Sequence, residues 1–329
     1  MQLDSTTRHI MKNLVALGIL LASALAHGQT YPAKPIRLVV PYAVGGPADL
    51  LARGLGERLG EVLGQGVIVE NKPGAGQILA AEEVARSPAD GYTYLIASDA
   101  AYSLNRYLYS KLPYDPVNDF IPMTRLVDAK LVLAVRPDFP ASSVRELVEY
   151  AKTHPGKLNY GSVGVGAGNH VAMAWFNTQN SLEMEHVPYQ SLMQAVRDIA
   201  ASRLDVMLVA VGSAATGVKT GMLKGLAVSG QVRSSLVPDV PTFAESGFAD
   251  FHATFWIGVA APAGTPPERY STVAAESARI VKSRSFREKY LNKLGFEPVG
   301  DTPQQFATFL LQDREHAAKR VKASGARLN

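Results

Sequence analysis

Residues 36–69 read IRLVVPYAVGGPADLLARGLGERLGEVLGQGVIV, and this stretch decides the fold class. Its first five residues form a β-branched run that predicts a strand, and Gly45 and Gly46 then open a loop. Leucines at helical spacing predict a helix over residues 48–63, and residues 67–69 predict a second strand. A strand, a helix and a strand in this order imply parallel strands joined by a right-handed crossover.

The same alternation continues outward along the chain. A helix over residues 77–86 and a strand over 92–97 complete a first series, and a second series of strands and helices covers residues 131–229. The tail begins with a strand over residues 251–260 and continues mainly as helices. These helices are expected at residues 268–282, 285–294 and 303–323. Because the tail has little sheet of its own, we expect it to return to the first series.

This return predicts a chain that crosses twice between two lobes, near residues 127–131 and 251–255. The expected fold class is α/β, with each lobe a β-sheet flanked by helices. Lobe 1 comprises residues 27–128 with 253–329, and lobe 2 comprises residues 129–252. Two crossing segments make a hinge, and a cleft lies between lobes joined in this way.

Composition excludes several classes of protein. The 329 residues are 47% apolar and 19% charged, which is enough apolar material for a large core. The absence of Cys excludes disulfide scaffolds, Cys-ligated zinc, iron–sulfur clusters and thiol catalysis. Lys and Arg number 33 against 29 Asp and Glu, and they are spread singly along the chain. The sequence therefore contains no basic cluster that would suit nucleic-acid binding.

The first 26 residues have the pattern of a signal peptide. Arg8 and Lys12 precede the uncharged run LVALGILLASALA, residues 14–26, which is shorter than the about 20 residues of a membrane span. The small residues Ala24 and Ala26 predict cleavage after Ala26. Met1 and Met11 are both possible starts, and an uncleaved anchor is the less favoured alternative. We therefore expect an exported protein, periplasmic in a Gram-negative source.

Two glycine loops follow strands at corresponding positions of the two lobes. Residues 41–49 read PYAVGGPAD, and residues 161–170 read GSVGVGAGNH. Ligands of open parallel sheets bind beyond the carboxyl ends of strands, and amides at helix starts favour anions. Neither loop contains Lys or Arg, so backbone amides and hydroxyls would hold an anion. One such loop alone is typical of a tight turn, whereas two matching loops favour a binding cleft for a small solute.

Patterns typical of enzymes are missing from the sequence. There is no GxSxG elbow, HExxH motif or P-loop, and the second glycine loop lacks the third glycine of a dinucleotide fingerprint. No two of the seven His residues are spaced i,i+4, so we expect no metal site and no cofactor. Ser162 and His170 could act as nucleophile and base, which leaves a serine hydrolase as an alternative. A lone His such as His186 is more typical of a structural residue.

Ten short stretches carry a family resemblance. They are YPAKPIR (31–37), VVPY (39–42), VENKPGAG (69–76), ADGY (89–92), LPYDPVNDF (112–120), PGKLNY (155–160), HVPY (186–189), DVM (205–207), PDVPT (238–242) and APAGT (261–265). In this order they make the chain after its leader resemble, along nearly its whole length, the substrate-binding receptors of tripartite tricarboxylate transporters, the Bug receptor family.

The resemblance implies a two-lobed periplasmic-binding-protein fold with two crossing segments. It implies a receptor, not an enzyme, that captures a small carboxylate or related amide and delivers it to the membrane permease of a tripartite transporter. Some members of the family are thought to feed sensor kinases, so a periplasmic ligand sensor is the alternative. We expect a monomer that has no nucleic-acid partner.

The resemblance also implies which residues contact the solute. Those expected are Tyr42, Ala43, Gly45, Gly46, Asp49, Ser98, Asp99, Ser162, Gly164, Gly166, Ala167, His170 and Tyr189. Asp49 is also an expected first-turn acid of a helix, although it could bind an amine. Three positions depart from the family pattern: Gln77 stands where a glycine is usual, Gln190-Ser191 stand where Lys-Gly is common, and Val209 stands where an acid is common. If that acid normally contacts an amino group, its absence disfavours an amino-acid ligand.

Overall fold

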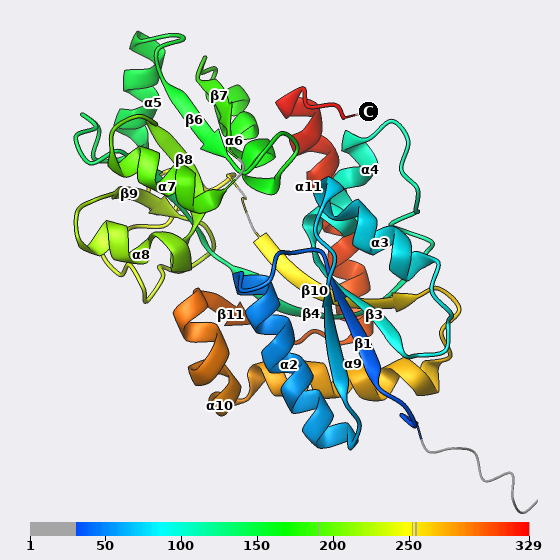
Figure 1. Cartoon of the computed structure of the whole chain (residues 1–329). Helices are drawn as coiled ribbons and strands as arrows, with labels where there is room; N and C mark the ends of the chain where they lie inside the picture. The colour runs from blue at the N-terminus through cyan, green and yellow to red at the C-terminus, as the bar shows by residue number, and fades with distance from the viewer. Residues whose placement is uncertain (1–30, 190, 252, 254, 329) are drawn as a thin grey trace, which may run out of the picture.

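The structure, a computed structural model, describes residues 31–189, 191–251, 253 and 255–328. The predicted leader, residues 1–26, lies outside the described residues. The described chain forms two β-sheets, each flanked by helices (Figure 1). This architecture confirms the α/β class expected from the sequence.

The first sheet has six strands in the order β11-β4-β10-β3-β1-β2. These are β1 (Ile36–Val40), β2 (Val67–Asn71), β3 (Thr93–Ser98), β4 (Phe120–Ala129), β10 (Phe255–Pro262) and β11 (Phe296–Pro298). Strands β1, β2 and β3 run parallel, as predicted, whereas β10 is antiparallel to both β3 and β4. The accompanying helices are α2 (Pro47–Leu63), α3 (Ile78–Ala85), α4 (Asn105–Leu108), α9 (Pro267–Lys282), α10 (Arg284–Phe286) and α11 (Pro303–Ser324). We call this group the six-stranded half.

The second sheet has five strands in the order β7-β6-β8-β5-β9. These are β5 (Leu131–Val135), β6 (Asn159–Ser162), β7 (Glu185–Pro188), β8 (Val206–Ala210) and β9 (Lys224–Val228). Strand β6 is parallel to β7 and β8, and β5 is antiparallel to β8 and β9. The accompanying helices are α5 (Val144–Thr153), α6 (Gly168–Gln179), α7 (Leu192–Ala200) and α8 (Val211–Lys219). We call this group the five-stranded half.

Helix α2 shows why the opening stretch decides the fold. Pro47 stands at its first turn, where the missing N–H has no consequence, and Gly64 ends it with a φ of 67°. Leu51, Leu55 and Leu59 are fully buried against the six-stranded sheet. Burial of each stabilises the fold by about 1.5–3 kcal/mol, so packing of one face, more than helix propensity, holds the helix in place.

The chain passes twice between the two halves. Ala129 ends β4, and Leu131 begins β5, so a single residue separates the two sheets there. The return lies between Val228, at the end of β9, and Phe255, at the start of β10. The division into moving lobes, residues 27–128 with 253–329 and 129–252, stays a prediction because it concerns which residues move together.

Several elements differ from the sequence prediction. Strands β4 and β7 and helix α8 were not expected, and β10 begins at Phe255, inside the predicted strand 251–260. The sequence of β4, FIPMTRLVDA, lacks strict alternation, and its pairing with β10 contains register shifts. Helix α8 contains Gly212 and Gly217, which lower helix propensity. Tertiary packing overrides both weak local signals.

The expected helix over residues 285–294 is broken. Helix α10 ends at Phe286, and two short turns over residues 287–291 and 292–294 follow it. Gly295, with a φ of 69°, ends the second turn. Its Cα lies so close to Gly212 of α8 that a side chain at either glycine would clash with the other backbone. The two halves therefore touch through glycines at this point.

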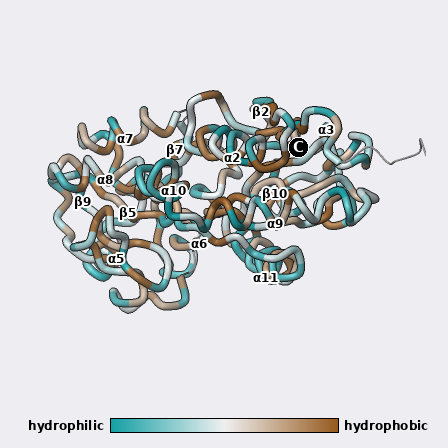
Figure 2. The backbone as a smooth tube through the Cα atoms, turned by 90° about the horizontal axis from the view of Figure 1, so that it is seen from below, coloured by the Kyte–Doolittle hydropathy of each residue, from teal (hydrophilic) through white to brown (hydrophobic). Residues whose placement is uncertain are grey.

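The two halves lie side by side, with α6 and α10 near their junction (Figure 2). Helix α6 packs against α11, so the second half also contacts the last helix of the first. Leu104, Leu108, Val171 and Val321 form an apolar cluster there. Within the described ranges, none of the helices has the length and apolar character that crossing a membrane requires.

Candidate functional site

The carboxyl ends of β1, β3 and β6 point toward the junction of the two halves (Figure 1). The first glycine loop, residues 42–49, follows β1, and the second, residues 161–170, includes the end of β6 and the start of α6. In the ribbon both loops lie near the junction of the two halves (Figure 1).

Asp49 organises the first loop from inside. Its carboxylate is only 1% exposed and accepts hydrogen bonds from the Gly45 N–H (2.8 Å), Asn71 Nδ2 (2.7 Å) and Arg53 Nε (3.0 Å). Burial opposes ionisation, but the hydrogen bonds from Arg53, Gly45 and Asn71 outweigh it and lower the pKa of Asp49. Because both oxygens of its carboxylate accept hydrogen bonds from the chain, Asp49 stabilises the conformation of the loop.

Gln77 joins the first loop to the end of β3. Its Nε2 donates to Tyr42 Oη (2.9 Å) and to Ser98 Oγ (2.7 Å), and its Oε1 accepts from the Ser98 N–H (3.2 Å). Burial raises the pKa of Tyr42, so its hydroxyl stays protonated. The sequence prediction named Tyr42 and Ser98 but placed Gln77 inside a helix. The structure instead places it just before α3 with a φ of 78°.

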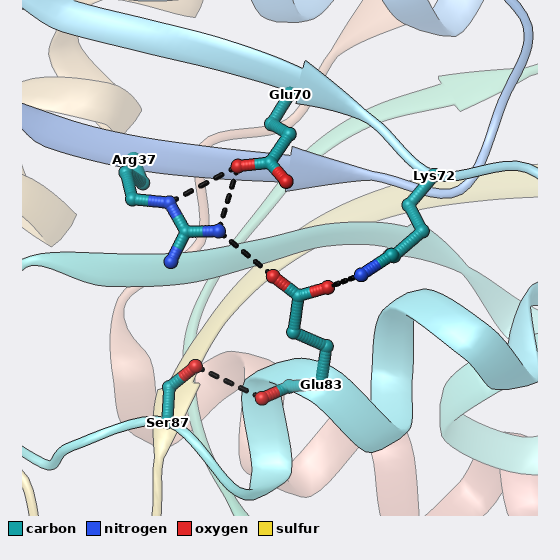
Figure 3. Close-up of polar contacts among 5 residues, drawn as sticks. All are labelled: Arg37, Glu70, Lys72, Glu83 and Ser87. Carbon is teal, nitrogen blue, oxygen red and sulfur yellow. Dashed lines mark hydrogen bonds and ion pairs between the residues drawn. The ribbon is translucent and has the colours of Figure 1, made fainter.

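A network of charged side chains fixes both ends of the turn that carries Gln77 (Figure 3). Arg37 of β1 contacts Glu70 of β2 (2.6 Å) and Glu83 of α3 (2.8 Å). Lys72, which follows β2, also pairs with Glu83. Each of these partly exposed pairs contributes little alone. Together they connect two strands with the helix on the far side of the turn.

Asp99 lies where the two halves meet. It follows β3 and is only 2% exposed. A Cβ added to Gly168, the first residue of α6, would lie 3.4 Å from its Oδ2. Burial raises the pKa of Asp99 to about 7, and the nearby charge of Arg320 opposes this shift. A carboxyl group that is partly protonated near neutral pH therefore faces the start of a helix in the other half.

The second loop is supported by neutral groups. Ser162 is fully buried, donates to the Gly164 carbonyl (3.0 Å) and accepts from the Gly164 N–H (3.1 Å). The Gly166 N–H donates to His170 Nδ1 (3.1 Å), which must therefore be unprotonated. Gly164 and Gly166 have φ values of 124° and 80°, so the loop requires glycine at both positions.

The hydrolase alternative named the wrong imidazole. Ser162 Oγ lies 2.6 Å from His186 Nε2, whereas His170 Nδ1 is occupied by the Gly166 N–H. Ser162 Oγ is also engaged by the Gly164 carbonyl (3.0 Å) and the Gly164 N–H (3.1 Å), so the loop backbone holds this hydroxyl. The register of β6 on β7, which places Tyr160 opposite His186, creates this pair. The sequence prediction treated a lone His such as His186 as more typical of a structural residue than of a base.

The two imidazole rings lie 3.9 Å apart between their centroids. Burial, with a smaller contribution from the neighbouring His186, lowers the pKa of His170 to about 4. Burial also lowers the pKa of His186. Both rings are therefore uncharged at neutral pH, and the second half of the site contains no cationic side chain from this pair.

The remaining predicted residues lie around these groups. Tyr189 donates its N–H to the Ser162 carbonyl (2.8 Å), but its hydroxyl donates to Asp198 of α7 (3.1 Å). Ala43 is exposed and Ala167 is half-buried at the start of α6. Gly46 precedes α2 in extended conformation. Tyr189 thus lies beside the second loop, but its hydroxyl is hydrogen-bonded to Asp198.

Helices α2 and α6 both begin at the junction without a side-chain cap. The first N–H groups of a helix have no partner within the helix, and the helix dipole favours an anion there. Within the described residues, no group of three or more His, Asp or Glu is arranged to hold a metal ion. The polar groups available for a ligand are therefore amides, hydroxyls, neutral imidazoles and the Asp99 carboxyl.

A separate cavity of about 340 Å³ lies beside the crossing segments. Lys130, Phe243, Phe251 and Glu297 are among its lining residues, and none of the predicted site residues is. Lys130 Nζ contacts Glu297 Oε1 (2.6 Å) and donates to the Arg233 carbonyl (3.1 Å). The cavity thus belongs to the region where the chain crosses between the halves, and it is distinct from the two glycine loops.

Comparison with known proteins gives consistent results. The family model "Tripartite tricarboxylate transporter family receptor" matches residues 51–325. A relative from Bordetella pertussis is 34% identical over 92% of this chain and 93% of its own length. Protein BugT of the same organism is 31% identical over 96% of this chain and 98% of its own length.

Solved structures agree with these relatives. Rpa4515 of R. palustris, described with adipate, has a TM-score of 0.81 and 32% identity, covering 91% of this chain and all of that chain. The periplasmic binding protein BugD has a TM-score of 0.76 and 30% identity over 90% of this chain and 99% of its own. MatC from Rhodopseudomonas palustris, with bound malate, has a TM-score of 0.77 and 28% identity over 88% of this chain and all of its own.

Proposed function

The chain belongs to the tripartite tricarboxylate transporter receptor family, and from this membership we propose that it captures a small carboxylate or related amide between its two halves for delivery to a membrane transporter. Family membership makes it a solute-binding receptor of the periplasmic-binding-protein fold and not an enzyme, as predicted. The class of solute that it captures and its delivery to a membrane transporter are what we propose.

The observation that carries the proposal is the pair of uncapped helix starts. Helix α2 belongs to the six-stranded half, and α6 belongs to the five-stranded half. A carboxylate between them would accept hydrogen bonds from both. Hydrogen bonds to a charged group contribute about 1.5–3 kcal/mol each, so four or five approach the ~8 kcal/mol of micromolar binding before ordering losses. Either half alone supplies too few donors.

Two structural neighbours indicate suitable probes. Rpa4515 is described with adipate and MatC with malate. Both solutes are dicarboxylates, and one of their carboxylates could meet each half of the site. We propose that this chain recognises a solute of the same chemical class through Tyr42, Ser98, the loop 161–170 and the start of α6.

We propose that the mature protein acts as a monomer in the periplasm after cleavage behind Ala26. The signal-peptide pattern of residues 1–26 supports export. The description of BugD as a periplasmic binding protein supports the same compartment. Native mass spectrometry of the mature protein purified from the periplasmic fraction tests the cleavage site, the monomer and any co-purified solute in one measurement.

Thermal unfolding and calorimetry test the binding function. A ligand that binds only the folded state stabilises it by about 2.7 kcal/mol at ~100 times its Kd. We expect adipate, malate or another short carboxylate or amide to raise the Tm and to bind with one-to-one stoichiometry. Hexanediol, the diol matched to adipate, should leave the Tm unchanged. A panel of mono- and dicarboxylates and amides that gives no shift at millimolar concentration would contradict the proposal.

A further inference from the structure

The turn between β2 and α3 has an unusual backbone. Four consecutive residues have positive φ: Gly74 (130°), Ala75 (44°), Gly76 (59°) and Gln77 (78°). Across the residues that the structure describes, only two other non-glycine residues have positive φ. A residue with a side chain persists in this conformation only where its surroundings fix it, and such residues cluster at functional sites.

Contacts on several sides fix this turn. The Gln77 N–H donates to the Gly74 carbonyl (2.9 Å), and Asn105 Nδ2 donates to the Gly76 carbonyl (2.8 Å). A Cβ at Gly76 would lie 3.0 Å from Tyr109 Oη, so the turn packs closely on its neighbours. The charged network of Arg37, Glu70, Lys72 and Glu83 holds the adjoining strand and helix (Figure 3). The backbone therefore delivers the Gln77 side chain to one position.

The orientation of the Gln77 amide follows from its partners. A backbone N–H can only donate, so the amide oxygen must be the atom that faces the Ser98 N–H at 3.2 Å. The amide nitrogen then faces Tyr42 Oη at 2.9 Å and Ser98 Oγ at 2.7 Å. The Nε2 group donates one hydrogen bond to each of these two hydroxyl oxygens.

This orientation sets the direction of the hydroxyl protons. Each hydroxyl oxygen accepts from Gln77, so its own proton must be donated elsewhere. Ser98 Oγ also accepts from the Ala100 N–H (3.4 Å). Burial raises the pKa values of its neighbours Tyr42 and Asp99, and hydrogen bonding by Ser98 opposes both shifts, which makes these two the acceptors for the Ser98 proton. Asp99 in turn faces Gly168 at the start of α6. The hydrogen bonds therefore run from Gln77 through the hydroxyls toward the Asp99 carboxyl, which lies at the junction of the two halves.

We propose that Gln77 is a positioning residue that makes the six-stranded half of the site selective for an oxygen acceptor. By donating to both hydroxyls, Gln77 prevents them from donating to it. The Ser98 proton then goes to Tyr42 or Asp99, and the Tyr42 proton is turned toward the solute. A carboxylate or an amide carbonyl can accept this proton, whereas an ammonium or amide N–H₂ cannot. This inference rests on the proposed function and names the chemical group that this half selects.

The test compares adipate with its monoamide by titration calorimetry in the wild-type protein and in Gln77→Glu. An ionised glutamate side chain of the same length can only accept, so the Tyr42 hydroxyl would donate to it and present a lone pair to the solute. We expect the affinity for adipate to fall by about tenfold or more. The affinity for the monoamide should fall less, because its N–H₂ group can donate. Gln304→Glu, on the exposed start of α11, is the matched control for charge.

The ratio of the two dissociation constants decides the inference. A shift of about tenfold toward the monoamide supports a positioning role. Equal weakening of both ligands, or no weakening, overturns it. Because the added charge of Gln77→Glu by itself disfavours the dianion adipate, the uncharged Gln77→Met, which keeps the length without donors, must also reduce the preference for adipate; an unchanged preference in Gln77→Met overturns the inference. A wild-type protein that binds no carboxylate or amide would remove the proposed function itself and, with it, the basis of this inference.

Discussion

The two halves of the candidate site perform the same task with different chemistry. Each presents a strand end, a glycine loop and an uncapped helix start to the junction. In the six-stranded half, carboxylates and the Gln77 amide support the loop. In the five-stranded half, Ser162 and the neutral pair His170 and His186 support it. The difference teaches that two loops of similar backbone geometry can be supported by different side chains. The titration of those side chains then sets how the stability of each half depends on pH.

The largest expected effect concerns Asp99 at high pH. Its folded pKa, about 7, lies above its ordinary value of 3.8, so its favourable contribution is present below pH 3.8 and is lost as pH rises through 7. Asp99→Asn removes this loss and should raise the free energy of unfolding at pH 8 by up to about 4 kcal/mol relative to wild type. Denaturant unfolding from pH 4 to pH 8 measures the difference. Asp239→Asn, at an exposed position, should leave the profile unchanged, and a profile for Asp99→Asn parallel to wild type would contradict the prediction.

The five-stranded half should respond in the opposite direction. The folded pKa of His170, about 4, lies below its ordinary value of 6.5, so its contribution is present above pH 6.5 and is lost as pH falls toward 4. This loss is up to about 3 kcal/mol. His170→Asn keeps an acceptor for the Gly166 N–H without the titration, so its unfolding free energy should fall less on acidification. His154→Asn, an exposed control, should retain the wild-type loss.

Removing Asp49 tests how far the first loop depends on charge. Asp49→Ala leaves the Gly45 N–H, Asn71 and Arg53 without their shared acceptor, and we expect a loss of about 2–3 kcal/mol in unfolding free energy at pH 7. Ser162→Ala, which removes neutral hydrogen bonds in the second loop, should lose about 1 kcal/mol. Equal losses in urea unfolding would show that the two loops do not differ in this respect.

The smallest effect compares glycines of the two loops. Gly45 and Gly166 have nearly the same φ, 82° and 80°. A Cβ at Gly45 meets nothing within 4 Å, whereas one at Gly166 would lie 2.7 Å from Leu328 Cδ1. Gly45→Ala should therefore lose about 1 kcal/mol from backbone strain alone, and Gly166→Ala about 1 kcal/mol more. Thermal unfolding of Gly166→Ala combined with Leu328→Ala should recover the difference, and an unchanged difference would mean that Leu328 is not its cause.

The sequence predicted local elements well where one residue pattern carries the signal. The strand at residues 36–40 and the helix that follows it are both present. These features depend on β-branching and on leucine spacing. The elements that were missed, β4 and α8, have weak local patterns and depend on partners far along the chain.

The candidate site was predictable as loops but not as contacts. Glycines after strands marked residues 42–49 and 161–170, and both lie at the junction. The pairing of Ser162 with His186 depends on the register of β6 on β7, and the bridge made by Gln77 depends on an uncommon backbone conformation. No spacing rule connects residues 77, 42 and 98 in the sequence.

By itself, the sequence determined the alternation of strands and helices, the positions of the glycine loops and the absence of Lys and Arg from them. These properties depend on residues close together in the chain, where propensity and side-chain spacing act directly. Only the tertiary structure decided which imidazole meets Ser162, which amide directs the Tyr42 hydroxyl and where Asp99 is buried. The reason is that hydrogen-bond partners and burial, which set proton direction and pKa, are fixed by strand register and by the packing of one half against the other.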